Sequence, residues 1–282
     1  MAPQTDARET ALRRRLEDCA GLVVAFSGGV DSAVLVHAAR QALGRARVVA
    51  VTARSPSLAA EELDAALRVA DELDVEHRLV DTDELSRPGY RQNDRDRCYH
   101  CKAELFDVID RVVRAADGRR GWPVAFGAIV DDLSDHRPGA RAAMERGVLA
   151  PLADAGFDKA AVRSYARSHG ISVAEKPALA CLASRIPYGT EVHASILAQL
   201  ERAESAVRAL GFAQFRVRHH GTVARLEVEP DAIPRAVELR AELVARLEAA
   251  GYTYISLDLV GYRSGAMNEV LAPRTDVTDA LA

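Results

Sequence analysis

The sequence predicts an α/β protein in which a parallel sheet covered by helices precedes a smaller C-terminal α+β domain. Through the first two thirds of the 282 residues, short apolar runs alternate with segments whose apolar residues recur at helical spacing. This alternation is typical of βαβ units, whose strands are parallel. After Pro187 the order changes to helix, strand, strand, helix and strand. We therefore predict two domains, residues 1–187 and residues 188–282.

The predicted elements follow one another at short intervals. Strand-length apolar runs occur in the first domain at 21–26, 46–53, 75–82 and 122–128, and helical spacing occurs at 32–43, 57–73 and 103–117. In the second domain we expect a helix at 193–210, two strands within 215–229, a helix at 231–249 and a strand at 253–259. Ligands of parallel sheets bind beyond the carboxyl ends of the strands, so we expect the site at that edge.

Composition and charge exclude several classes of protein. Hydrophobic residues make up 49% and charged residues 28% of the chain, as in ordinary globular proteins. The 37 Lys and Arg against 41 Asp and Glu give a net charge of −4, which argues against a nucleic acid as the main partner. No apolar run has the roughly 18 residues of a membrane span, and no secretory signal is recognisable. We expect a cytoplasmic protein with reduced cysteines.

A loop of sequence SGGVDS, residues 27–32, follows the first predicted strand and leads into a helix. Its two glycines let backbone N–H groups approach a ligand, and its two hydroxyls add donors beside a helix N-terminus, which favours a phosphate. The carboxylate of Asp31 needs a cation between itself and phosphates, so we expect Mg²⁺ there. The lysine of a Walker P-loop is absent. The candidate nucleotide-binding residues are Ser27, Gly28, Gly29, Asp31 and Ser32.

Three of the four cysteines lie in motifs. Cys98 and Cys101 form a C-x-x-C pair and Cys181 lies in KPALACLASRIPYG, whereas Cys19 has no motif and is expected to pack in a helix. Taken alone, Cys181 is typical of a buried thiol, and the pair is typical of two cysteines at a helix start. A zinc site needs four ligands. Three cysteines suit a [4Fe–4S] cluster with one open iron.

Several blocks of sequence together resemble one family. SGGVDS is similar to the pyrophosphate loop (PP-loop) of the ATP pyrophosphatases, which implies ATP as a cosubstrate. With DRCYHCKAELF, GAIVDDLSDHRPG, GVLAPLADAGFDKAAVRSYARSHGI and KPALACLASRIPYG, it resembles the LarE type of ATP-dependent sulfur transferase. FRVRHHGTVARLEV and GYRSGAMNE extend the resemblance to nearly the full chain. The resemblance also implies a homo-oligomer.

The resemblance implies a reaction and a source of sulfur. LarE-type enzymes help to make the nickel-pincer cofactor of lactate racemase: ATP adenylates a carboxylate of a pyridinium dicarboxylate mononucleotide, and sulfur then displaces AMP to give a thiocarboxylate. Cys181 is implied as the catalytic residue. It either sacrifices its own sulfur and becomes dehydroalanine, or holds a [4Fe–4S] cluster together with Cys98 and Cys101. Lys176 and Arg185 are candidates for favouring the reactive thiolate or for binding phosphate.

Charged and polar residues near the second domain are predicted to bind the substrate. Ser184 and Arg185 belong to the Cys181 block, and Arg216 and Arg218 alternate along a predicted strand and therefore share a face. The resemblance implies substrate binding for this arginine pair. Together with Arg225, converging guanidinium groups suit a phosphate, although a solvated strand face is the alternative.

The loop after the fourth predicted strand carries further candidates. Asp131 and Asp132 are candidates for orienting metal or substrate and Arg137 for holding phosphate, with ordinary turn chemistry as the alternative for the acidic pair. This loop departs from the family pattern at Ile129, Val130 and His136. Four residues of the second domain are expected on the surface: Glu201, Glu204, His219 and His220.

Three other functions remain open at this point. A tRNA-thiolating PP-loop enzyme has a similar loop and clustered cysteines, but the acidic net charge and the lack of an RNA-binding module argue against it. An ammonia-dependent ligase similar to NAD or GMP synthetase would not need Cys181. A nucleotide-sensing module without catalysis is the third. We favour the sulfur transferase, with a small pyridinium mononucleotide as partner and neither nucleic acid nor membrane.

Overall fold

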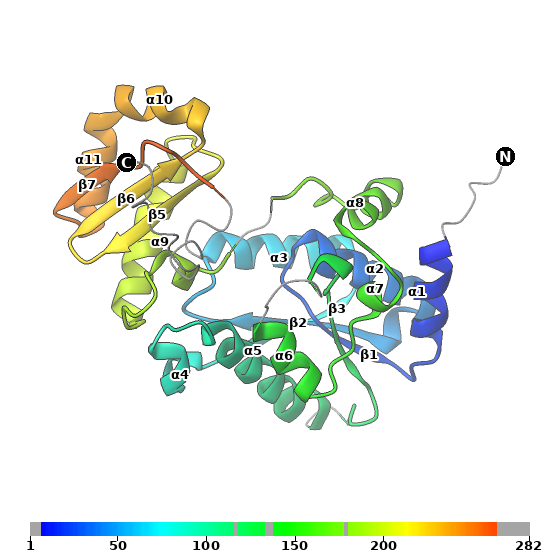
Figure 1. Cartoon of the computed structure of the whole chain (residues 1–282). Helices are drawn as coiled ribbons and strands as arrows, with labels where there is room; N and C mark the ends of the chain where they lie inside the picture. The colour runs from blue at the N-terminus through cyan, green and yellow to red at the C-terminus, as the bar shows by residue number, and fades with distance from the viewer. Residues whose placement is uncertain (1–6, 116–117, 133–137, 178–179, 264–282) are drawn as a thin grey trace, which may run out of the picture. The chain divides into compact units, whose positions relative to one another are not determined.

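The structure, a computed structural model, describes residues 7–115, 118–132, 138–177 and 180–263 (Figure 1). The chain divides into two compact units, residues 1–180 and residues 181–282. The functional domain boundary after residue 187 stays a prediction.

The first unit contains a four-stranded parallel sheet, which confirms the predicted fold class (Figure 1). Its strand order is β3-β2-β1-β4, so β1 is central. The central strands β1 and β2 arise from apolar, β-branched runs that are buried on both faces, whereas the edge strand β3 is mostly polar and only its Val80 is buried. Their bounds are β1 (Leu22–Ala25), β2 (Val48–Arg54), β3 (Glu76–Asp81) and β4 (Val124–Phe126).

Helices cover both faces of this sheet (Figure 1). Alternate residues of a strand point to opposite faces, so Leu22 and Val24 belong to one core and Val23 to the other. The first core includes side chains of α1 (Ala7–Glu17), α2 (Val30–Leu43), α3 (Ala60–Glu72), α7 (Pro151–Asp154) and α8 (Lys159–Ser168). The second includes side chains of α5 (Arg97–Val108), the π-helical segment Ile109–Ala115 and α6 (Pro138–Glu145).

Helix α5 begins at Arg97, six residues before the predicted start, and therefore contains both cysteines of the C-x-x-C pair. Asn93 has a φ of 54° and turns the chain after α4 (Pro88–Arg91). The buried guanidinium of Arg97 donates to Asn93 Oδ1 at 2.5 Å, which fixes the start of α5 against this turn. The remaining connections of the unit contain short helices: η1 (Arg45–Arg47), η2 (Glu84–Ser86) and η4 (Val130–Asp132).

The second unit is an α+β arrangement, as predicted. Strands β5 (Phe215–His220) and β6 (Val223–Val228) form an antiparallel hairpin that turns at Gly221, whose φ is +64°, and β7 (Tyr254–Leu257) lies parallel to β6. The predicted helix at 231–249 is two helices separated at Leu239, α10 (Ile233–Glu238) and α11 (Arg240–Ala249). The other elements are η5 (Leu182–Arg185), α9 (Ala194–Arg208) and η6 (Pro230–Ala232).

Strand β5 lies at the edge of the second sheet, so one side of its backbone is open to contacts from outside the sheet. Phe215 and Val217 are buried, and so are the two arginines that alternate with them. An edge strand has backbone N–H groups that its own sheet leaves unpaired. The N–H of Val217 donates to the carboxylate of Glu204 on α9 at 3.1 Å.

Candidate functional site

The loop at residues 27–32 lies between the end of β1 and the first turn of α2. The Ser32 hydroxyl accepts the Ser27 backbone N–H at 3.3 Å and donates to the Gly29 carbonyl oxygen at 3.0 Å. The Gly29 N–H donates to the Ser27 hydroxyl at 3.4 Å. These bonds hold the loop at the start of α2, where the first N–H groups have no acceptor within the helix. The arrangement is suited to a phosphate.

Two close approaches explain why glycine occurs at Gly28 and Gly127. Gly28 has a φ of +69°, and a Cβ there would lie 2.7 Å from the Cα of Ala66 in α3. A Cβ at Gly127, directly after β4, would lie 2.8 Å from the backbone nitrogen of Ser32. Because neither position has room for a side chain, the backbone of the loop packs directly on α3 and on the end of β4.

Asp31 is held by a lysine that the sequence analysis did not single out. The ammonium of Lys159 lies 2.8 Å from each carboxylate oxygen of Asp31. Lys159 is the first residue of α8, and its backbone N–H donates to Asp131 Oδ2 at 2.8 Å. Asp131 therefore fixes the residue that contacts Asp31. Its neighbour Asp132 accepts the Ile129 N–H at 3.0 Å, and Arg137 lies outside the described residues.

A second lysine contacts the loop backbone. The ammonium of Lys176 lies 2.8 Å from Glu62 Oε2 in α3 and donates to the Gly28 carbonyl oxygen at 3.4 Å. The Lys176 and Glu62 side chains are mostly buried. Lys176 thus links the last segment of the first unit to the loop through a carbonyl oxygen and a carboxylate.

The strands beneath the loop are joined by a buried threonine. The Thr52 hydroxyl on β2 donates to the carbonyl oxygen of Phe26, the residue before the loop, at 2.7 Å. Nε2 of His77 on β3 lies 2.8 Å from the same hydroxyl. Burial lowers the pKa of the His77 imidazole, so it is neutral at pH 7 and can donate to a hydroxyl that itself donates onward. Thr52 and His77 therefore fix the backbone from which the loop departs.

The Asp31 carboxylate fits the role of a ligand to a phosphate-bound Mg²⁺. Its two oxygens already hold one cation, the Lys159 ammonium, and Mg²⁺ typically takes one or two carboxylates together with phosphate oxygens and water. Within residues 7–115, 118–132, 138–177 and 180–263, no cluster of three or more His, Cys, Asp or Glu side chains is arranged for a metal ion. A metal ion here would take its other ligands from the nucleotide and water.

Cys98 and Cys101 lie in the first turns of α5, one turn apart. Cys98 is exposed and Cys101 is half-buried. Residues i and i+3 are neighbours on one helix face, so two thiols placed in this way fit two ligand positions of a single iron–sulfur cluster. The ring of Tyr99 between them is covered by the Arg141 guanidinium of α6, 4.6 Å from the ring centre. Cys19 is partly buried against the first core, which confirms that it packs, but it follows the end of α1 at Glu17 and does not lie in the helix as expected.

Cys181 belongs to the second unit and is exposed, so the expectation of a buried thiol for this residue alone is wrong. It precedes the short helix η5, and its carbonyl oxygen accepts a hydrogen bond from Arg185 Nη1 at 3.0 Å. The same nitrogen donates to the Ser184 hydroxyl at 2.9 Å. Arg185 therefore fixes the backbone that carries the thiol.

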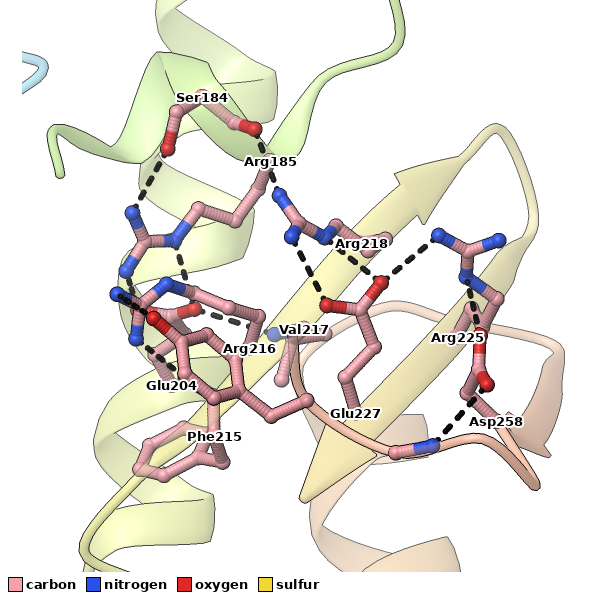
Figure 2. Close-up of polar contacts among 12 residues, drawn as sticks. Ser184, Arg185, Glu204, Phe215, Arg216, Val217, Arg218, Arg225, Glu227 and Asp258 are labelled. Carbon is pink, nitrogen blue, oxygen red and sulfur yellow. Dashed lines mark hydrogen bonds and ion pairs between the residues drawn. The ribbon is translucent and has the colours of Figure 1, made fainter. Parts of the chain in front are cut away.

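The Arg185 guanidinium also forms a bidentate ion pair with Glu204 of α9, with Nε–Oε1 at 2.8 Å and Nη2–Oε2 at 2.9 Å (Figure 2). Glu204 is only 3% exposed, so its expected surface position is wrong. The carboxylate is buried because it has two partners there, Arg185 and the edge N–H of Val217. A bidentate pair supplemented by a third hydrogen bond is the geometry that makes a buried charge tolerable.

Arg218 of β5 forms a second buried pair, with Glu227 of β6 (Figure 2). Its Nε and Nη2 donate to the two oxygens of Glu227 on β6 at 3.0 and 2.8 Å, and its Nη1 donates to the Ser184 carbonyl oxygen at 2.9 Å. Arg225 also pairs with Glu227 at 2.8 Å and lies 3.7 Å from Asp258. Ser184 thus connects the segment that begins at Cys181 to Arg218 on the β5–β6 hairpin.

Arg216 differs from these arginines because it forms no ion pair with any described carboxylate. It is 5% exposed, its Nη1 donates to the Phe215 carbonyl oxygen at 2.6 Å, and its guanidinium lies 4.9 Å from the centre of the Tyr262 ring. Burial and the neighbouring Arg185 lower the pKa of the Arg216 guanidinium. Four guanidinium groups and three carboxylates gather here, namely Arg185, Arg216, Arg218 and Arg225 with Glu204, Glu227 and Asp258.

The predicted site residues thus fall into two groups. The loop residues and the C-x-x-C pair lie in the first unit, and Cys181, Ser184, Arg185, Arg216 and Arg218 come together in the second. The lysine at 159 and the carboxylates at 204 and 227 were missed because helical and strand carboxylates usually face solvent. His219 is buried against Tyr252, which corrects its expected surface position, whereas His220 is exposed. No helix in the described part of the chain is both long and apolar enough to span a membrane.

A parallel sheet with this serine- and glycine-rich loop between β1 and α2 defines the first unit as a PP-loop nucleotide-binding fold. Residues 5–104 match the NAD synthase family model. Over 251 residues, the chain is 41% identical to an uncharacterised protein of Synechocystis, covering 88% of this chain and 92% of the relative. It is 24% identical to an uncharacterised protein of Methanocaldococcus jannaschii, covering 86% of this chain and 91% of the relative.

A characterised relative is more informative. Over 264 residues the chain is 35% identical to pyridinium-3,5-bisthiocarboxylic acid mononucleotide synthase of Lactiplantibacillus plantarum, covering 94% of this chain and 95% of the relative. The chain belongs to this LarE-type family of PP-loop enzymes.

Proposed function

We propose that this protein is an ATP-dependent sulfur transferase that converts a carboxylate of a pyridinium dicarboxylate mononucleotide into a thiocarboxylate for nickel-pincer cofactor synthesis. The observation that carries the proposal is the set of hydrogen bonds that connects the Cys181 segment to Arg185 and Arg218 in the second unit. Arg185 binds the Cys181 carbonyl oxygen, and Arg218 binds the Ser184 carbonyl oxygen. An exposed thiol therefore belongs to the same polar cluster as Arg216, a buried guanidinium that forms no ion pair with any described carboxylate, and this suits an anionic substrate.

The first step activates the carboxylate. A substrate carboxylate oxygen attacks the α-phosphorus of ATP, and pyrophosphate leaves with the electron pair of the broken P–O bond, which yields an acyl adenylate. The loop at residues 27–32 supports this step because its N–H groups and hydroxyls are suited to the pyrophosphate. A Mg²⁺ ion held by the nucleotide and Asp31 would neutralise the leaving charge.

The second step delivers sulfur. The Cys181 thiolate attacks the acyl carbon and AMP leaves, which forms a thioester on the enzyme. A base then removes the Cα proton of Cys181, the Cβ–S bond breaks, and its electron pair departs with sulfur as the thiocarboxylate. Residue 181 remains as dehydroalanine. This route is a single turnover unless the cysteine is replaced.

The pair on α5 supports a second sulfur source. Cys98 and Cys101 would supply two ligands of a [4Fe–4S] cluster and Cys181 the third, because the pair lies one turn apart on one helix. Such a cluster would supply sulfur from an open iron position and spare the cysteine.

Chain connectivity supports the cooperation of activation and delivery. Lys176 contacts the loop at the Gly28 carbonyl oxygen, and Cys181 follows five residues later. Five residues of fully extended chain span at most about 18 Å. Homo-oligomerisation stays a prediction.

Mass spectrometry of the intact protein before and after reaction with ATP, Mg²⁺ and the pyridinium substrate tests the proposal. Loss of about 34 Da, one sulfur with two hydrogens, at residue 181 together with thiocarboxylate product supports the sacrificial route. Product with unchanged mass supports the cluster route, in which Cys98→Ser and Cys101→Ser also abolish turnover. Cys19→Ser is the matched control and should react like the wild type. Absence of both product and pyrophosphate would overturn the proposal.

A further inference from the structure

The ion pair between Lys159 and Asp31 joins two segments that are 128 positions apart in the sequence. Asp31 is in the first turn of α2, within the phosphate-binding loop, and Lys159 is the first residue of α8. The ammonium is equidistant from the two carboxylate oxygens, at 2.8 Å. The ammonium therefore contacts both of the carboxylate oxygens that the proposed function assigns to a metal ion.

The backbone of Lys159 is fixed, whereas its side chain is partly free. Its N–H donates to Asp131 Oδ2 at 2.8 Å, and Asp158 caps α8 by accepting the Ala161 N–H at 2.7 Å. The side chains of Lys159 and Asp31 are 36% and 29% exposed. Solvent screens an ion pair this exposed, so the pair is weak and can exchange partners without moving α8.

The negative charge of a bound nucleotide favours movement of the Lys159 ammonium from Asp31 to the phosphates. Before a nucleotide binds, Lys159 is paired with Asp31 and Lys176 with Glu62, so each of these two ammonium groups has a carboxylate partner. A triphosphate brings several negative charges to a loop that lacks the lysine of a Walker P-loop. Lys176 is more buried than Lys159 and already contacts the Gly28 carbonyl oxygen. Of these two lysines, Lys159 is therefore the one whose ammonium can move to a bound nucleotide.

We propose that Lys159 is a phosphate-binding residue. Its ammonium is paired with Asp31 before ATP binds, and it transfers from Asp31 to the β- and γ-phosphates when ATP enters the loop. This inference rests on the proposed function, because it concerns the same nucleotide site. The transfer frees the Asp31 carboxylate for the metal ion that accompanies the nucleotide. Departure of pyrophosphate returns the ammonium to Asp31. Asp131, which binds the Lys159 N–H, is then a positioning residue for this lysine.

Isothermal titration of the full chain with three probes tests the role of Lys159. The probes are α,β-methylene-ATP, inorganic pyrophosphate and AMP. Lys159→Met should weaken binding of the first two about 10- to 100-fold, the range expected for a lost charge-assisted hydrogen bond, and leave AMP within about twofold. Arg167→Met is the matched control: it removes another basic side chain of α8, one paired with Glu175, and should change none of the three affinities.

A second variant distinguishes an ion pair that exchanges when a nucleotide binds from a permanent structural ion pair. Asp31→Asn should strengthen pyrophosphate binding severalfold in the presence of EDTA, because the carboxylate that competes for Lys159 is gone. A permanent structural pair predicts weaker binding in both variants. Equal losses for ATP analogue and AMP in Lys159→Met, or no strengthening in Asp31→Asn, would overturn the inference. A wild-type chain that binds no ATP analogue would instead overturn the proposed function.

Discussion

Arg185 and Glu204 form a buried bidentate ion pair in the second unit, and each has a further partner that defines the site. The guanidinium binds the backbone of Cys181, and the carboxylate binds the edge N–H of β5. The Arg185 and Glu204 side chains are 3% and 5% exposed. Through this pair, the backbone at Cys181 is connected to the strand that carries Arg216 and Arg218.

Replacement of Glu204 by glutamine should therefore destabilise the protein strongly. The Arg185 guanidinium would remain buried without its counter-charge, a loss of about 3–5 kcal/mol. Urea unfolding monitored by circular dichroism measures this change. Glu248→Gln, on the exposed face of α11, is the matched control and should lie within about 0.5 kcal/mol of the wild type. A loss in Glu204→Gln no larger than in the control would show that the pair is not stabilising.

Arg216 and Arg218 should respond differently to the same substitution. Arg218→Gln leaves Glu227 buried with Arg225 as its remaining guanidinium partner, so we expect a stability loss near the low end of the range for broken buried pairs, about 3 kcal/mol. Arg216→Gln removes a buried cation that forms no ion pair with the carboxylates of residues 7–115, 118–132, 138–177 and 180–263, so stability should stay within about 1 kcal/mol while substrate binding weakens tenfold or more. Unfolding curves and titration with the pyridinium substrate test both. The reverse pattern would contradict this division of roles.

Gly28→Ala should disrupt the nucleotide loop because of steric overlap with α3 as well as backbone strain. A positive φ alone costs a non-glycine residue about 1–2 kcal/mol. Gly147→Ala is the control: its φ is +65°, and a Cβ there meets nothing within 4 Å. Gly28→Ala should be less stable than this control and should bind ATP analogues more weakly. Equal stability and unchanged affinity would mean that the approach of Ala66 does not matter.

Acidification should destabilise the first unit through His37. Burial, followed by the charges of His169 and Arg40, lowers the pKa of the His37 imidazole below 6.5, and its Nδ1 lies 3.0 Å from the Tyr165 hydroxyl. The folded state therefore favours the neutral ring. The stabilisation is complete above pH 6.5 and is lost as the pH falls through the lowered folded pKa.

Urea midpoints measured near pH 7.5 and pH 5 test this dependence. His37→Gln keeps a hydrogen-bonding group and removes the titration, so it should lose less stability on acidification than the wild type. His193→Gln, at an exposed position of the second unit, should behave like the wild type. The same acid sensitivity in His37→Gln and the wild type would exclude His37 as the cause.

The sequence by itself determined the fold class and most of the order of helices and strands along the chain, and it predicted a loop suited to phosphate. Apolar runs such as 46–53 are continuous, and SGGVDS combines glycines, hydroxyls and a helix start within six residues. These signals are local, because hydrophobic periodicity and backbone freedom are properties of neighbouring residues. The family resemblance then added the reaction, the implied role of Cys181 and the arginine pair of β5.

Only the tertiary structure decided which charges are paired. Glu204 and Glu227 look like ordinary solvent-facing carboxylates in the sequence, yet both are buried because guanidinium groups from other elements reach them. Lys159 has no local signal, because its partner Asp31 is 128 positions away. An ion pair depends on distance in space, and a buried charge is tolerated only where its partner lies within hydrogen-bonding distance, so no pattern along the chain could have predicted these pairs.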